Sequence, residues 1–199
     1  IRNKFEFFGT KANERRKAVN KYKNKNNRPK YENINKIIKE LWEKNEREFQ
    51  YFAMELLEEY YKEFDEEIII LFEYMIVNKS WWDTIDRISK KLVGKYFKKF
   101  PKKKNYIIEK WINSGNIWLQ RTTILFQLAY KKDTDVDLLF NIIKRLKDID
   151  EFFIQKAIGW ALREYSKTDP KAVKKFIENN TLSNLSKREG LKFINKEGI

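Results

Sequence analysis

Apolar residues recur every three or four positions along most of the chain. Ile34, Ile38 and Leu41 follow this spacing, and so does the stretch from Phe49 to Tyr60. The spacing gathers apolar side chains on one face of a helix, whereas a half-buried strand would alternate them every second residue. Only six Gly and three Pro interrupt the 199 residues. The pattern therefore predicts an all-α protein.

Polar and helix-breaking residues divide this pattern into about eleven helices. We expect them over residues 12–24, 31–44, 46–62, 66–77, 81–97, 103–113, 117–131, 134–146, 150–165, 170–179 and 185–195. Side chains that favour a helix N-terminus stand at or near the start of several segments; they are Thr10, Asn13, Ser80, Asn116, Asp133 and Asp150. Pro170 suits a first turn, where its missing N–H is not needed.

Several of the expected helices begin with a similar short sequence. The repeated triplets are Glu48-Phe49-Gln50, Trp81-Trp82-Asp83, Trp118-Leu119-Gln120 and Phe153-Ile154-Gln155. Their third positions lie 33, 37 and 35 residues apart. A degenerate repeat of this length is typical of an α-solenoid, since one helical pair cannot bury its apolar face alone. We expect a single domain over residues 1–199, a curved array of helical pairs with a concave wall, and the alternative is an irregular helical bundle.

The composition limits the chemistry that the chain could perform. It contains no Cys and no His, which excludes Ser-His-Asp and Cys-His nucleophiles, disulfide bonds and zinc sites of the usual ligand types. Residues 133–137 resemble the start of a calcium loop, but Leu138 stands where Gly is needed and Lys144 where Glu is needed. We therefore expect no metal and no cofactor, and catalysis must rest on carboxylates, Lys, Tyr or hydroxyl groups.

The chain is strongly basic, with 43 Lys and Arg against 29 Asp and Glu and a net charge of +14. The surplus lies in residues 1–44 and 95–132, at +9 each, while residues 45–73 carry −8. Such an excess favours a polyanionic partner, because phosphates are attracted and their counterions are released on binding. The longest apolar run, residues 68–72, is far shorter than the roughly 20 residues of a membrane span. We expect a soluble, cytoplasmic protein with no membrane partner.

Trp82 and Asp86 are the first candidate site. They are spaced i and i+4, so they share one face of a helix. In the repeat alignment Asp86 falls where the other copies have small or apolar residues, so an ionisable group needs an explanation. The alternative is a structural salt bridge from Asp86 to Arg87 or to a neighbouring helix. Asp83 is expected to cap or hydrogen-bond the start of this helix.

A second candidate site combines Lys156, Trp160 and Arg163, which are spaced four and three and flank an indole with two cations. Gly159 inside this helix costs about 1 kcal/mol relative to Ala, which suits close approach of another backbone or a ligand. Arg121 occupies the repeat position of Lys156, and cations at equivalent positions indicate a track for a phosphate backbone. The alternative is tight helix packing with Trp160 in the core.

Three stretches of the chain are distinctive: KSWWDTID (residues 79–86), WLQRTTIL (118–125) and EFFIQKAIGWALREYSK (151–167). They closely resemble the AlkD-type DNA alkylation repair glycosylases. The resemblance runs from Phe5 to about Ile194 and implies an α-solenoid of HEAT-like helical pairs that binds double-stranded DNA in a concave basic groove. We expect such a protein to act as a monomer. The family has a further helix ahead of the segment at residues 7–9, and we expect this helix to be missing from the N-terminus of the chain.

The resemblance also implies an activity. It is that of a monofunctional DNA glycosylase of base excision repair, which releases cationic N-alkylated purines such as 3-methyladenine and 7-methylguanine. The family's cleft of two Trp, one Asp and one Arg corresponds to Trp82, Trp160, Asp86 and Arg121, and all four residue types are retained. Some relatives have lost such residues and do not excise bases, so retention favours the active branch.

The chemistry of such a substrate agrees with these residues. An N3- or N7-alkylated purine is cationic, so its glycosidic bond is already weakened and needs no strong general acid. Positive charge then develops on the deoxyribose, where the carboxylate of Asp86 would stabilise it and orient a water molecule. Trp82 and Trp160 would contact the electron-poor sugar or base through their ring faces. Flanking phosphates would be held by the nearby cations, Arg121 with Lys156 or Arg163.

Two other functions stay open at this point. A catalytically silent solenoid would use the same basic groove to bind damaged or branched nucleic acid. A HEAT-type scaffold would bind a protein instead, and its one suggestive patch is the acidic segment at residues 45–73. Release of a free alkylated base distinguishes the glycosylase from both.

Overall fold

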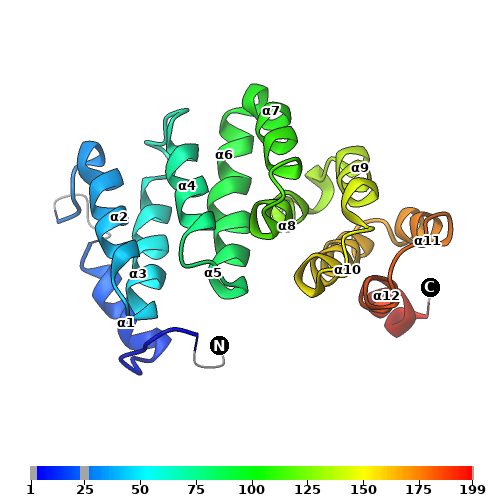
Figure 1. Ribbon diagram of the computed structural model, residues 1–199, viewed down its shortest axis with the longest axis horizontal. Coiled ribbons are helices and arrows are strands. Elements are labelled where there is room, and N and C mark those ends of the chain that lie inside the picture. The colour runs from blue at the N-terminus through cyan, green and yellow to red at the C-terminus, as the bar shows by residue number, and fades with distance from the viewer. Residues whose placement is uncertain (1–3, 23–26, 199) are drawn as a thin grey trace. The chain divides into compact units, whose positions relative to one another are not determined.

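The computed structural model describes residues 4–22 and 27–198 of the chain (Figure 1). Within these residues the protein is all-α, and the one β-type contact is an isolated bridge between Glu6 and Glu46. The α-helices are α1 (Ala12–Asn20), α2 (Ile34–Glu43), α3 (Arg47–Leu57), α4 (Ile68–Val77), α5 (Trp82–Arg87), α6 (Gly94–Lys99), α7 (Pro101–Ile112), α8 (Ile117–Leu125), α9 (Val136–Leu146), α10 (Phe152–Ser166), α11 (Pro170–Glu178) and α12 (Asn184–Glu197). None of the described helices is long and apolar enough to cross a bilayer. The all-α prediction is confirmed.

The chain divides into two compact units, residues 1–88 and residues 89–199. Each unit has its own apolar core. Trp42 and Phe72 are completely buried in the first unit, and Trp111 and Phe126 are completely buried in the second. That residues 1–199 form a single domain stays a prediction.

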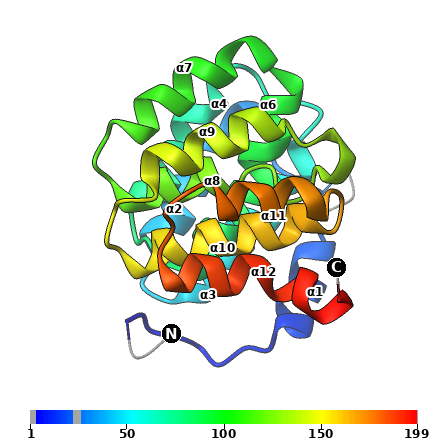
Figure 2. The ribbon, with the colours of Figure 1, turned by 90° about the vertical axis from the view of Figure 1, so that its right-hand side faces the viewer.

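Helical pairs are the building element of both units. In the first unit α2 packs against α3, and in the second α7 packs against α8 and α11 against α12. The helix α10 makes its most extensive contacts with α12, which lies beside it (Figure 2). This is the helical repeat that the spacing of about 35 residues predicted.

The repeated amide has a defined structural role. Gln50, Gln120 and Gln155 lie in the first turns of α3, α8 and α10. Each donates from Nε2 to a main-chain carbonyl at or beside the end of the preceding helix, at 2.9 Å in all three cases. Carbonyls at a helix end lack a partner within the helix. The repeat therefore fixes the connection between the two helices of a pair.

Two expected helices are interrupted. The segment predicted at 81–97 consists of α5, a π-helical turn at Ile88–Val93 and then α6. The segment predicted at 117–131 ends as an α-helix at Leu125, and a 3-10 turn follows at Lys131–Asp133. Beyond this end, the side chain of Gln127 bonds both the N–H and the carbonyl of Asp135, at 2.8 and 3.2 Å, and so holds the connection to α9.

The helix starts were predicted less well than the helices. Asn116 caps α8 through its side-chain oxygen, and Pro170 opens α11, both as predicted. For α1, α5, α9 and α10 the predicted caps are wrong, since the capping positions are Lys11, Trp81, Asp135 and Glu151. The first helix ends at residue 20, and residues 23–24 of its predicted extent lie outside the described residues.

Candidate functional site

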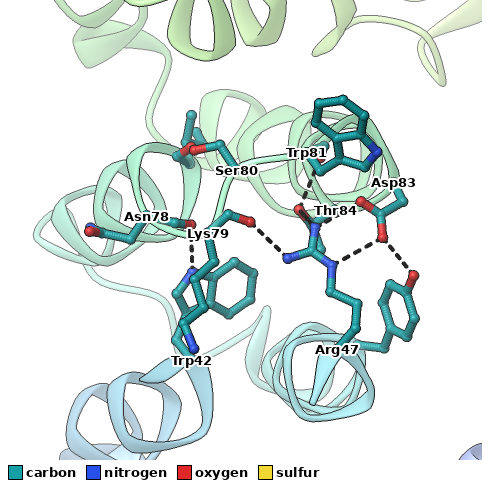
Figure 3. A network of polar contacts seen from close by, with 10 residues as sticks. Trp42, Arg47, Asn78, Lys79, Ser80, Trp81, Asp83 and Thr84 are labelled. Carbon is teal, nitrogen blue, oxygen red and sulfur yellow. Dashed lines mark hydrogen bonds and ion pairs between the residues drawn. The ribbon is translucent and has the colours of Figure 1, made fainter. Parts of the chain in front are cut away.

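The helix α5 is fixed at its first turn by a buried arginine of α3 (Figure 3). Arg47 is 0% exposed and donates through Nη2 and Nε to the two carboxylate oxygens of Asp83, at 2.7 and 3.1 Å. The same guanidinium donates to the carbonyl of Lys79 at 2.7 Å and to the hydroxyl of Thr84 at 2.8 Å. One side chain thus holds both the connection before α5 and the helix itself, with the bidentate geometry that suits Arg and carboxylate.

Asp83 is also bonded by a tyrosine of α3. The hydroxyl of Tyr51 donates to Oδ2 of Asp83 at 2.5 Å. Burial and this hydrogen bond raise the pKa of Tyr51 above its ordinary value, so the phenol keeps its proton and stays a donor. Asp83 does not cap α5, whose capping position is Trp81. It is the anchor that ties α5 to α3.

A second ion-pair network fixes the far end of α5. Arg87 donates from Nε to Glu58 at 2.7 Å and from Nη1 to Glu55 at 3.4 Å. Arg15 of α1 also donates to Glu55, at 3.1 Å. Glu55 is buried, and a buried charge needs compensation. Two arginines from different helices provide it.

These two networks determine how α5 is turned relative to α3. Asp83 and Arg87 are one helical turn apart and both contact α3. Trp82 and Asp86 are also one turn apart, on the adjacent face, because each precedes an anchored residue by one position, or about 100° of helix. The side chain of Trp82 is 43% exposed, and Asp86 is partly exposed. The first unit therefore presents an indole and a carboxylate on one rigid helix face.

In the second unit, Arg121 lies on α8 and is almost buried, at 3% exposed. Its Nη1 donates to the carbonyl of Phe153 in α10. The helices α8 and α10 pack against each other, so this bond joins two members of the repeat. That Arg121 contacts a phosphate stays a prediction.

Lys156 and Arg163 of α10 converge on one carboxylate of α12. Lys156 Nζ lies 2.9 Å from Glu189 Oε1, and Arg163 Nη1 lies 3.1 Å from Glu189 Oε2. A third cation, Lys192, donates to Oε1 at 2.6 Å. Hydrogen bonds from Lys192 and Lys156, acting against the effect of burial, lower the pKa of Glu189 to about 2, so Glu189 is ionised at neutral pH. Trp160, between the two α10 cations in sequence, is partly exposed.

Glycine allows the close crossing of α10 and α12. A Cβ at Gly159 would lie 2.5 Å from the Cβ of Glu189 and 3.0 Å from the carbonyl oxygen of Ser186. The hydroxyl of Ser186 donates to the main-chain carbonyl of Gln155 at 2.8 Å. Gly159 therefore serves tight helix packing, which was the alternative explanation for this glycine.

Comparison with known proteins identifies the family. The family model for the DNA alkylation repair enzymes matches residues 1–194. A solved structure from Enterococcus faecalis, of a predicted DNA alkylation repair enzyme, is 32% identical over 97% of this chain and 90% of that chain, with a TM-score of 0.86. The chain belongs to the DNA alkylation repair enzyme family.

Two further solved structures resemble this protein in fold. AlkD2 and smu.31, both from Streptococcus mutans, are each 24% identical and match 90% of this chain. They are covered over 87% and 90% of their own lengths, with TM-scores of 0.68 and 0.67. The curated proteins gave no match.

As a DNA alkylation repair enzyme, the protein distributes its candidate residues over both units. The first unit holds Trp82 and Asp86, and the second holds Arg121, Lys156, Trp160 and Arg163. No group of three or more His, Cys, Asp or Glu side chains in the described part of the chain could hold a metal ion.

Sequence reasoning missed the residues that support the candidate residues from other helices. These are Arg47, which anchors α5, and Glu189, which pairs with the cations of α10 and with Lys192 of its own helix. Arg47 carried no local signal. Glu189 and Lys192 stand at i and i+3, a spacing that predicts a surface ion pair and does not indicate a buried acid.

Proposed function

We propose that this DNA alkylation repair enzyme is a monofunctional DNA glycosylase that releases cationic N-alkylated purines, such as 3-methyladenine and 7-methylguanine, from duplex DNA. The observation that carries the proposal is the carboxylate of Asp86 one helical turn from the exposed indole of Trp82, on a helix held at both ends. Two charged networks to α3 support a rigid presentation of this pair. A rigid support is what a catalytic group needs.

The reaction asks little of the protein beyond negative charge and aromatic surface. The electrons of the breaking glycosidic bond neutralise the positive charge of the alkylated base. The base therefore leaves as a neutral molecule and needs no proton from an acid. The deoxyribose becomes electron-poor, and the Asp86 carboxylate stabilises it and orients the attacking water, whose oxygen bonds C1′ while its proton passes to the carboxylate or to solvent. Trp82 and Trp160 offer ring faces to the cationic sugar or base, an attraction of roughly 0.5–2 kcal/mol each.

The cations of the second unit would bind backbone phosphates that flank the lesion. Lys156 and Arg163 are 38% and 31% exposed, while Arg121 is 3% exposed. Support for a phosphate contact is therefore stronger for Lys156 and Arg163 than for Arg121. Phosphate contacts position a protein on DNA without reading its sequence, which suits an enzyme that seeks a damaged base in any context.

A second candidate function is DNA binding without base release. It is favoured by the basic cluster on α10 and α12, which does not depend on Asp86. The two functions share the DNA partner and differ only in the chemical step.

The decisive experiment measures free alkylated base released from methylated duplex DNA by the wild type and by Asp86→Asn. We expect Asp86→Asn to lower the single-turnover rate by about 100-fold or more, the usual effect of removing one charge-stabilising group. DNA affinity should change little, because the carboxylate acts on the reacting sugar and not on the phosphates.

The matched control is Asp148→Asn, an identical chemical change at a side chain that is 79% exposed. It should release base at the wild-type rate. Near-normal release by Asp86→Asn would remove Asp86 from the mechanism. Tight binding of methylated DNA by the wild type with no released base would select the silent binding protein.

A further inference from the structure

The crossing of α10 and α12 assembles four charged side chains in one place. Lys156, Arg163 and Lys192 all lie within 3.1 Å of the carboxylate of Glu189. The cluster contains three positive charges and one negative charge, so it keeps a net charge of +2. One cation would be enough for an ion pair that joins the two helices. The cluster has two more cations than such a pair requires.

Exposure differs sharply between the acid and the bases. The side chain of Glu189 is 3% exposed, while those of Lys156, Arg163 and Lys192 are 38%, 31% and 48% exposed. The carboxylate therefore lies beneath the cations, whose heads still reach solvent. Long cationic side chains on a protein surface are usually mobile, and holding them costs conformational entropy. Here the buried acid has already ordered all three.

The main chain around the cluster is built to bring the acid this close. The absence of a side chain at Gly159 leaves room for Glu189 between Lys156 and Arg163, because any Cβ there would lie 2.5 Å from that of Glu189. Ser186, one turn before Glu189, locks the same crossing through hydrogen bonds to Gln155, at 2.8 Å to its carbonyl and 2.8 Å to its side-chain oxygen.

We propose that Lys156, Arg163 and Lys192 form a single preorganised site for a backbone phosphate of DNA, and that Glu189 is the positioning residue that holds them. The proposal rests on the DNA binding of the proposed function and is independent of base release. Arg supplies a planar fork and Lys supplies point charges, which together suit the two free oxygens of a phosphodiester. The partial neutralisation by Glu189 keeps three like charges together before DNA arrives.

The test is the salt dependence of binding to a short undamaged duplex, measured for wild type, Glu189→Gln and Glu189→Asp. Glu189→Gln keeps the length and removes the charge, whereas Glu189→Asp keeps the charge and shortens the reach. If Glu189 positions the cations, both variants bind more weakly, and each lowers the slope of log affinity against log salt by about 0.9 for the lost phosphate contact. This equals about a 3.5-fold smaller loss of affinity over a fourfold rise in salt.

If Glu189 acts only through its negative charge and does not position the cations, the opposite result is expected. Glu189→Gln would then bind DNA more tightly, as would the control Glu178→Gln, which removes a charge from the exposed surface of α11. Glu189→Asp would match the wild type. That outcome would overturn the positioning role. Thermal melting of each variant, well above the assay temperature, shows that a binding change does not reflect unfolding.

If the Glu189 variants do not fold, variants of Lys192 test the phosphate site instead. Lys192→Ala should lower the slope by about 0.9, while Lys174→Ala, at an exposed position of α11, should leave it near the wild-type value. Equal slopes for these two variants would remove Lys192 from the phosphate site. Because binding is measured on undamaged DNA, failure of base release would not affect either result.

Discussion

Replacing Gly159 with Ala should destabilise the protein, although Ala is the better helix former. The added methyl group would lie 2.5 Å from the Cβ of Glu189 and 3.0 Å from the carbonyl oxygen of Ser186. Carbon atoms in contact are normally about 3.5–4.0 Å apart, so the shortfall is about 1 Å. The crowded atoms belong to backbone and Cβ, and no side-chain rotation can move them. The helices α10 and α12 must therefore separate.

The magnitude follows from two opposing effects. Overpacking of a core costs about 1–3 kcal/mol, and a rigid backbone contact places this site in the upper part of that range. Ala in place of Gly within a helix stabilises the helix by up to about 1 kcal/mol. The net loss is about 1–2 kcal/mol. Urea unfolding followed by circular dichroism would measure it as a lower midpoint with an unchanged slope.

Gly190→Ala is the matched comparison on the partner helix. A Cβ there would lie 3.1 Å from Cδ1 of Ile177 and 3.2 Å from Cβ of Leu162. The nearer atom is the movable end of a flexible side chain, so we expect a smaller loss, below about 1 kcal/mol after the helix gain. Wild-type or higher stability of Gly159→Ala would refute the close-contact reasoning, as would a larger loss at Gly190.

Two further predictions concern the charged networks. Arg47→Ala should lower the free energy of unfolding by about 3–5 kcal/mol, because it leaves Asp83 as a buried charge without its main partner; adding Asp83→Asn should restore part of the loss in the same urea experiment. The pKa of Glu189, about 2 against an ordinary 4.5, is lowered in the folded state, so its ion pairs contribute stability above pH 4.5 that is lost as the pH falls toward 2. That contribution is at most about 3 kcal/mol, and the stability difference between wild type and Glu189→Gln should shrink over this pH range.

The features that sequence reasoning predicted well are those set by local spacing. Apolar periodicity and the recurring triplets depend on residues within a few positions of one another, and they gave the helices and the repeat. The connection after Leu125 is held by Gln127 bonding Asp135, and the π-helical turn after Arg87 has no signal in nearby residues. Helix ends therefore follow from side-chain bonds of this kind as well as from propensity.

The candidate residues divide in the same way. Trp82 and Asp86 could be assigned to one helix face from their spacing alone. That Lys156 and Arg163 share a buried acid could not be predicted, because Glu189 is 26 residues beyond Arg163 and reaches it only through the crossing at Gly159. The glycine signalled a close approach, and its partner became visible only in three dimensions.

The departure of α5 from the repeat links the fold to the proposed chemistry. In α3, α8 and α10 a neutral glutamine binds the end of the preceding helix, but at the equivalent position α5 has Asp83. Arg47 takes over the task, since it bonds the carbonyl of Lys79 in the connection before α5 and grips Asp83 through both oxygens. A glutamine gives one donor group to this connection, whereas the arginine spans connection, helix and α3 together. The stronger anchor occurs on the helix that carries Asp86, whose carboxylate would have to stay in place in the proposed reaction while positive charge develops beside it.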